Sequence, residues 1–371
     1  MTNQKIPWAK PDIGKDELFE IVDSFKTEWL TMGPKTKKLE ENLAGFLNVP
    51  FAIAVSNGTV ALDMALKVLG IKTGDEVIVP AMTYFATVSA ICQQGAIPVF
   101  VDIEDQTFNL NPAKIEEAIS PKTKAVVFID YGGNPADYDR IVEIAQKHNI
   151  AVLQDGAQSL GGTYKGRPAG AQANISTMSF HMAKVMTTVE GGMIFTHDPK
   201  IKEQLCTMRN QGEQAGCKYK HTLLGTNARL TDLQAAIGLA QFEKLPKYLQ
   251  ARKQIAKQYD RIFNLKAEKI KTISTNFEDN ANAYFFYPIL IDKRDQIAEA
   301  LRAKYDIDTR VAYSMPVYDQ PVFASRQLPF RKMDCPVAEW FTSRVLNLPI
   351  FFGMTEEEIN RVAWAVLVEL N

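Results

Sequence analysis

Residues 177–193 read T-M-S-F-H-M-A-K-V-M-T-T-V-E-G-G-M, and Lys184 lies near their centre. An apolar run ends at Phe180, and Gly191 and Gly192 open a second apolar run, so the pattern predicts two short strands joined by a loop. The neighbours of the lysine are mostly apolar or hydroxyl side chains, a setting that disfavours the ammonium form and makes the amine a better nucleophile. Taken alone, the segment is also compatible with a lysine in a surface hairpin.

The bulk composition is that of an ordinary globular protein. The chain has 371 residues, 46% hydrophobic and 23% charged, with a net charge of −1. A guide of about 150 residues per domain predicts two domains. A net charge close to zero does not indicate binding to nucleic acid or to an anionic membrane. No apolar run approaches the roughly 20 residues of a membrane span. Four scattered cysteines form no disulfide or zinc pattern, which favours a reducing cytoplasm and predicts no metal site.

Short apolar strands alternate with amphipathic helices on the N-terminal side of the Lys184 segment. This alternation predicts an α/β fold with a mainly parallel sheet between two layers of helices. Ligands of such sheets bind outside the carboxyl ends of the strands, so Asp102, Asp130 and Asp155, which each close a strand, are site candidates. For Asp102 and Asp130 a turn or helix cap is the preferred interpretation. The predicted strands are residues 51–55, 75–80, 97–102, 125–130 and 150–155.

The S-N-G-T segment at residues 56–59 lies between a predicted strand and a predicted helix. Backbone N–H groups and a hydroxyl at a helix N-terminus suit an anion such as phosphate. Serine, asparagine and threonine also serve as plain helix caps. The segment by itself leaves these two interpretations open.

The pattern changes after about residue 250. We expect a large domain over residues 13–249 and a smaller α/β domain over residues 250–371, on which residues 1–12 pack. The elements predicted on either side of this boundary are a helix that ends at Pro246, a charged helix at 247–263, a strand at 285–291, a helix at 295–304, a strand at 308–313 and helices near 336–346 and 355–369.

Six motifs in register resemble one family over nearly the whole chain, the DegT-type nucleotide-sugar aminotransferases. The resemblance implies a pyridoxal-phosphate enzyme of the aspartate aminotransferase fold (fold type I), with a mainly parallel, seven-stranded sheet in the large domain. It also implies a homodimer with shared active sites. The motifs are S-N-G-T (56–59), P-A-M-T-Y-F-A-T (80–87), D-G-A-Q (155–158), S-F-H-M-A-K (179–184), T-T-V-E-G-G (187–192) and G-T-N-A-R-L-T-D-L-Q-A-A (225–236).

The resemblance assigns a residue to each group that the cofactor requires. Pyridoxal phosphate is an electron sink whose aldehyde is held as an imine by a lysine, and a carboxylate keeps its pyridine nitrogen protonated. Lys184 matches the Schiff-base lysine and Asp155 matches that carboxylate. The other implied contacts are Gly58, Thr59 and Ser179 at the phosphate, Asn227 from the partner subunit, and Tyr84 and Gln158 on the two ring faces.

The implied reaction moves an amino group from glutamate or glutamine to the ketone of a nucleotide-linked keto-deoxysugar, for amino-sugar biosynthesis of cell-surface polysaccharides or natural products. Some relatives carry histidine in place of the lysine and act as dehydratases, so Lys184 favours transamination. Tyr318 stands where many members have a histidine, which prevents a direct transfer of their substrate contacts. The residues expected to line the substrate pocket are His181, Glu190, His221, Arg229, Tyr313 and Tyr318.

Three alternatives stay open at this point. The chain could be a pyridoxal-phosphate sugar dehydratase, an aminotransferase for a keto-polyol that carries no nucleotide, or a regulatory protein that keeps the fold without turnover. Product analysis separates the enzymes, because one forms a new amine and the other removes a hydroxyl.

Overall fold

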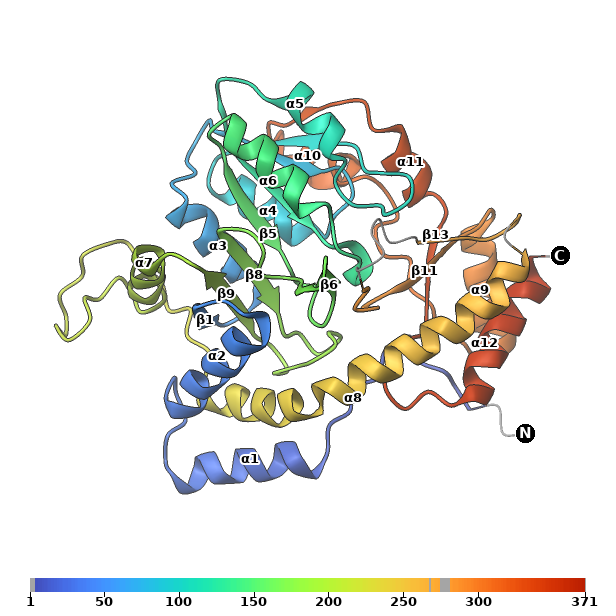
Figure 1. Ribbon diagram of the computed structural model, residues 1–371, viewed down its shortest axis with the longest axis horizontal. Helices are drawn as coiled ribbons and strands as arrows, with labels where there is room; N and C mark the ends of the chain where they lie inside the picture. The colour runs from blue at the N-terminus through green and yellow to red at the C-terminus, as the bar shows by residue number, and fades with distance from the viewer. Residues whose placement is uncertain (1–3, 267, 274–280, 371) are drawn as a thin grey trace.

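The computed structural model describes residues 4–266, 268–273 and 281–370 (Figure 1). Its centre is a sheet of eight strands in which β9 runs antiparallel to both neighbours and the other pairs are parallel. This confirms the predicted α/β fold with a mainly parallel sheet, but the sheet has one strand more than the seven that the resemblance implies, because the two-residue β12 adds to its edge beside β3. In spatial order the strands are β1 (Phe51–Val55), β9 (Gly192–Thr196), β8 (Ile175–Ser179), β5 (Ala151–Asp155), β4 (Thr123–Ile129), β2 (Glu76–Pro80), β3 (Ile97–Val101) and β12 (Arg331–Lys332).

Helices cover both faces of this sheet, and one long helix, α8, runs from beneath it to a smaller unit with α9 and α12 (Figure 1). The α-helices are α1 (Lys15–Lys26), α2 (Pro34–Leu47), α3 (Gly58–Val68), α4 (Phe85–Gln93), α5 (Ile115–Ala118), α6 (Tyr138–Lys147), α7 (Pro199–Arg209), α8 (Asp232–Phe263), α9 (Arg294–Tyr305), α10 (Pro321–Arg326), α11 (Pro336–Thr342) and α12 (Glu356–Glu369). The 3₁₀ helices are η1 (Pro112–Lys114), η2 (Tyr131–Gly133), η3 (Asn264–Lys266) and η4 (Val317–Asp319).

The two sheet faces are apolar because successive side chains of a strand point to opposite sides. In β2, Val77 and Val79 join a core formed with α2, α3 and α4, whereas Ile78 joins a second core formed with α5 and α6. All three side chains are fully buried. The continuous apolar run of β2 is therefore the pattern expected of a strand that is buried on both faces.

The smaller unit has its own sheet and core. Its strands are β10 (Lys271–Thr272), β11 (Tyr287–Leu290) and β13 (Val345–Leu348), and a separate hairpin is formed by β6 (Thr163–Tyr164) and β7 (Arg167–Pro168). The core contains apolar residues of α9, α12 and the second half of α8. Ile6 pairs with Ile307 and is buried in the same core. None of the helices in the described part of the chain is both long and apolar enough to cross a membrane.

Three predicted elements are wrong in extent. The helix expected to end at Pro246 continues as α8 to Phe263, because buried residues on both sides of the proline pack along its whole length. The strand expected at residues 308–313 is reduced to an isolated bridge, because only Arg310 of this described segment pairs with the neighbouring β13, and the run ends at Tyr313 with a positive φ of 64°. The helix expected to reach residue 346 ends at Thr342, because the following V-L-N-L segment pairs with β11 as β13.

Asp102 and Asp130 do not lie at the cavity described below. The Asp102 carboxylate accepts hydrogen bonds from the N–H groups of Val337 (3.1 Å) and Ala338 (2.9 Å), in the first turn of α11. This confirms its interpretation as a helix cap. Asp130 is fully buried and accepts hydrogen bonds from the Ala136 N–H and the Tyr138 hydroxyl, among other donors, so it fixes the turn after β4.

Candidate active site

A cavity of about 870 Å³ opens at the carboxyl ends of the parallel strands. Its walls follow β1, β2, β4, β5 and β8, which is where a doubly wound sheet binds its ligands. β9 enters the sheet at the same edge, because Gly192 pairs with both Val55 and Ser179. The cavity brings together most of the residues expected from the sequence: Gly58, Thr59, Tyr84, Asp155, Gln158, Ser179, His181, Lys184, Glu190 and Tyr313.

Lys184 lies in a tight loop between β8 and β9. Its backbone N–H donates to the carbonyl of His181 (2.8 Å), and the Phe180 carbonyl accepts from the Thr188 N–H (3.0 Å) and the Thr187 hydroxyl (3.0 Å). The amine lies 4.4 Å from the centroid of the Phe285 ring. Burial lowers the pKa of this amine to about 8, against a smaller opposing effect of the Asp155 carboxylate.

The lowered pKa predicts the pH dependence of cofactor capture. With a pKa of about 8 rather than the ordinary 10.5, about a tenth of the Lys184 amine is neutral at pH 7. The initial rate at which the apoprotein forms its imine absorbance with added pyridoxal phosphate should therefore rise up to about pH 8 and then level off. A lysine derivative in solution is the control, and its rate should keep rising to about pH 10. A protein profile that follows the derivative would contradict the assigned pKa.

Asp155 closes β5 and is almost completely buried. Its carboxylate accepts hydrogen bonds from the Thr87 hydroxyl (2.7 Å) and from the Ala157 N–H (3.1 Å). Burial raises the pKa of this carboxyl, while these two donors and the Lys184 amine act against the rise. A buried carboxylate on the floor of a cavity is well placed to hold a cationic ligand group.

The N-terminus of α3 forms a cradle beside Ser179. The Asn57 side chain accepts from the Val60 N–H (2.9 Å), which leaves the first N–H groups of the helix, those of Gly58 and Thr59, for a ligand. A Cβ at Gly58 would lie 2.9 Å from the Cβ of Ser179, so only glycine permits this close approach. These groups and the Lys184 amine fit the phosphate and the aldehyde of pyridoxal phosphate.

Gln158 and Tyr313 form one connected wall of the cavity. The Gln158 side chain accepts from the Gly132 N–H (2.7 Å) and donates to the Tyr313 hydroxyl (2.9 Å). Tyr84, at the start of α4, is 64% exposed at the opening. Val189, which precedes Glu190 of the cavity wall, is a β-branched residue with a positive φ of 71°, a strained conformation of the kind found at functional sites.

Four of the expected residues lie outside this cavity. Tyr318 is buried, donates a hydrogen bond to Glu339 (2.8 Å) and packs on Phe100, so it belongs to the core rather than to the pocket wall. Asn227, His221 and Arg229 lie on the connection between α7 and α8, part of which extends away from the body of the protein (Figure 1). The contact of Asn227 with a partner's cofactor stays a prediction.

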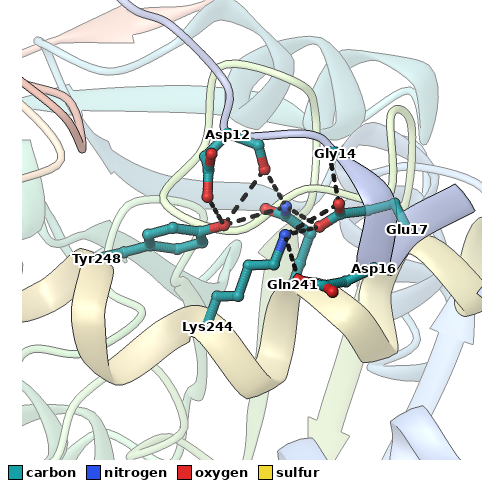
Figure 2. A network of polar contacts seen from close by, with 7 residues as sticks. All are labelled: Asp12, Gly14, Asp16, Glu17, Gln241, Lys244 and Tyr248. Carbon is teal, nitrogen blue, oxygen red and sulfur yellow. Dashed lines mark hydrogen bonds and ion pairs between the residues drawn. The ribbon is translucent and has the colours of Figure 1, made fainter.

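Trp8 and Arg310 also line the cavity, and the sequence interpretation did not single them out. Trp8 precedes a strap, residues 10–17, that is fixed to α8 by a polar network (Figure 2). Glu17 forms an ion pair with Lys244 (2.8 Å) and accepts from Gln241 (2.7 Å). The Tyr248 hydroxyl donates to the Asp12 carboxylate (3.0 Å). No local pattern in the sequence signals this contact, because it joins residues more than 200 positions apart.

The fold and this site together define the class of pyridoxal-phosphate-dependent transaminases. Comparison with known proteins gives the family: the model of the DegT/DnrJ/EryC1/StrS aminotransferase family matches residues 11–367, and the chain belongs to this family. The chain is 34% identical to GDP-perosamine synthase of Caulobacter vibrioides, covering 98% of this chain and 97% of that protein.

Solved structures agree in fold over the whole length. Helicobacter pylori PseC, an aminotransferase of pseudoaminic acid biosynthesis, superposes with a TM-score of 0.92 at 26% identity and 99% coverage of both chains. Streptococcus pneumoniae Spr1654 in its PLP form gives a TM-score of 0.91 at 31% identity and 98% coverage of both, and the same protein is also known in a PMP form. The similarity confirms the predicted family and fold.

Proposed function

We propose that this transaminase moves an amino group from glutamate or glutamine to the ketone of a nucleotide-linked keto-deoxysugar. The observation that supports the proposal best is the Lys184 amine, with its lowered pKa, in one cavity with the buried Asp155 and the α3 cradle. GDP-perosamine synthase and PseC, two relatives of this chain, are named for amino-sugar products or pathways. A sugar ketone is therefore the substrate class that the comparisons favour.

The bound cofactor would supply an electron sink that stabilises negative charge on the substrate carbon. Lys184 would hold the cofactor and then, once released, would move the proton to and from that carbon with its amine. Asp155 would hold a proton at the ring nitrogen, because a buried carboxylate favours a cation next to it. Gly58, Thr59 and Ser179 would bind the phosphate, and Gln158 and Tyr313 would orient the ring.

The proposal includes a homodimer. Several apolar side chains stay exposed on the cavity wall, in the loop between β8 and β9 and on the connection before α8, among them Tyr84 (64%), Met182 (49%), Val189 (46%) and Leu224 (94%). A second copy that covers them would bury apolar surface and bring Asn227 near the cofactor phosphate.

The cysteines are unpaired, which supports a reducing, cytoplasmic setting.

The cofactor spectrum tests this function directly. Glutamate or glutamine, added to the holoenzyme without a ketone, should convert the absorbance of lysine-bound cofactor to that of the amino form. A nucleoside-diphosphate 4-keto-6-deoxyhexose should then restore the first spectrum and give a new sugar amine in the mass spectrum. Loss of a hydroxyl without a new amine would identify a dehydratase. If only a keto-polyol without a nucleotide restored the first spectrum, the substrate would not be a nucleotide sugar. A spectrum that responds to no donor would favour a regulatory protein.

A further inference from the structure

Arg310 and Trp8 carry a second inference, which rests on the function proposed above. We propose that they form an oxyanion subsite, separate from the α3 cradle, that binds a substrate rather than the cofactor. The oxyanion is either a carboxylate of the amino donor or the diphosphate of the nucleotide sugar. Both groups present the paired oxygen atoms that a guanidinium binds with two parallel hydrogen bonds.

Arg310 is a cation of the cavity wall that no described carboxylate neutralises by an ion pair. Its guanidinium carbon lies 5.1 Å from the centroid of the Trp8 ring. Within the described residues no carboxylate forms an ion pair with it, and Asp308, two positions earlier, pairs with Lys5 (3.0 Å). Its backbone is fixed by Asn347, through the Arg310 N–H to the Asn347 carbonyl (3.0 Å) and the reverse bond (2.9 Å). A permanent charge is thus held in place at the wall.

The other basic side chains of the cavity wall have partners or other roles. His181 lies 3.7 Å from Glu190, and Lys184 has the role of holding the cofactor in the proposed function. The cofactor phosphate has the N–H groups of α3. Substrate oxyanions therefore need a further donor, and arginine is the residue that pairs best with carboxylate and phosphate.

The Trp8 ring forms the aromatic part of this subsite. Its ring packs against Phe286 (5.7 Å between centroids), and Phe286 packs against Phe285 (4.3 Å), which contacts the Lys184 amine. This aromatic row connects the guanidinium to the reacting amine along one wall. The Trp8 indole N–H is buried and meets no acceptor in the part of the chain that the structure describes.

The test compares the two half-reactions of Arg310→Gln holoenzyme with those of the wild type. In the first arm, glutamate is titrated into the holoenzyme and the conversion of lysine-bound cofactor to the amino form is followed by absorbance. In the second arm, the enzyme with its cofactor in the amino form is titrated with the nucleoside-diphosphate ketosugar, and the return of the lysine-bound absorbance is followed. The half-saturating concentration should rise about 10- to 100-fold in one arm, with a limiting rate close to wild type, because a charged hydrogen-bonding partner is lost. A rise in the first arm identifies the donor carboxylate, and a rise in the second identifies the diphosphate.

Two further variants keep the outcome clear. Arg140→Gln removes an exposed arginine of α6 outside the cavity and should match the wild type in both arms. Arg310→Lys keeps the charge and the alkyl chain against Trp8. Its half-saturating concentration should rise about 10-fold in the same arm, because an ammonium cannot form the paired hydrogen bonds. This variant provides the test if the glutamine variant folds poorly. Arg310 variants that match the wild type in both arms would overturn the subsite. A wild type that reacts with no donor would instead overturn the proposed function.

Discussion

Replacing Lys184 by alanine is expected to lower the rate of amino transfer by about 10⁴-fold, the upper end of the effect of losing a catalytic acid–base group. The amine is the nucleophile that faces the cavity, and burial lowers its pKa to about 8, where it can both accept and return a proton near neutral pH. No second lysine lines the large cavity among the described residues, so no neighbour can replace it.

The Lys184→Ala variant is best measured in single turnovers from added pyridoxal phosphate and glutamate. Its spectrum should lack the lysine-bound absorbance, and borohydride should fix no cofactor to residue 184. Lys124→Ala, which removes an exposed lysine of β4, is the matched control and should behave as the wild type. Methylamine in the buffer should restore part of the lost rate by substituting for the missing amine. A variant that retained borohydride-fixed cofactor and normal turnover would exclude Lys184 as the Schiff-base residue.

The sheet and most of the cofactor-facing residues could be predicted from the sequence because they depend on local order. Each strand of the parallel sheet is an apolar run followed by a turn, and the residues of those turns must meet at one edge. This order points to Asp155 and the Gly58 turn, whereas Ser179 follows only from the family resemblance. The match of motifs to a family then placed Lys184 among them, whereas its own neighbours had favoured a surface hairpin.

The errors and omissions arise from contacts between distant parts of the chain. Pro246 usually signals the end of a helix, but tertiary packing along α8 outweighs the one hydrogen bond that proline removes. Tyr318 was expected in the pocket by alignment of a loop, and its burial against Phe100 follows from packing that no motif encodes. Trp8 is held at the cavity by contacts with distant residues, among them Phe286, and the strap after it is bound to α8 (Figure 2).

Replacing Asp155 by asparagine is expected to lower the rate of the glutamate half-reaction by about 10²- to 10³-fold, as for the loss of one preorganised electrostatic group. Asparagine has nearly the same shape and can still accept the hydrogen bond from Thr87, so the fold and cofactor binding should persist. What is lost is the negative charge that holds a proton on the ring nitrogen, and a neutral ring withdraws electrons poorly. Stopped-flow absorbance with glutamate measures the change.

Two companion variants distinguish charge from position. Thr87→Val removes the hydroxyl that lowers the pKa of Asp155 and so opposes the effect of burial. The rate of the glutamate half-reaction should fall about 5-fold, which corresponds to one hydrogen bond of about 1 kcal/mol. Asp155→Ala reconstituted with a cofactor methylated at the ring nitrogen should regain part of the rate, because that nitrogen then carries a fixed positive charge. If the methylated cofactor restored nothing while the alanine variant bound it normally, Asp155 would act by packing rather than by charge. If Asp155→Asn reacted at the wild-type rate, another group would have to hold the ring nitrogen.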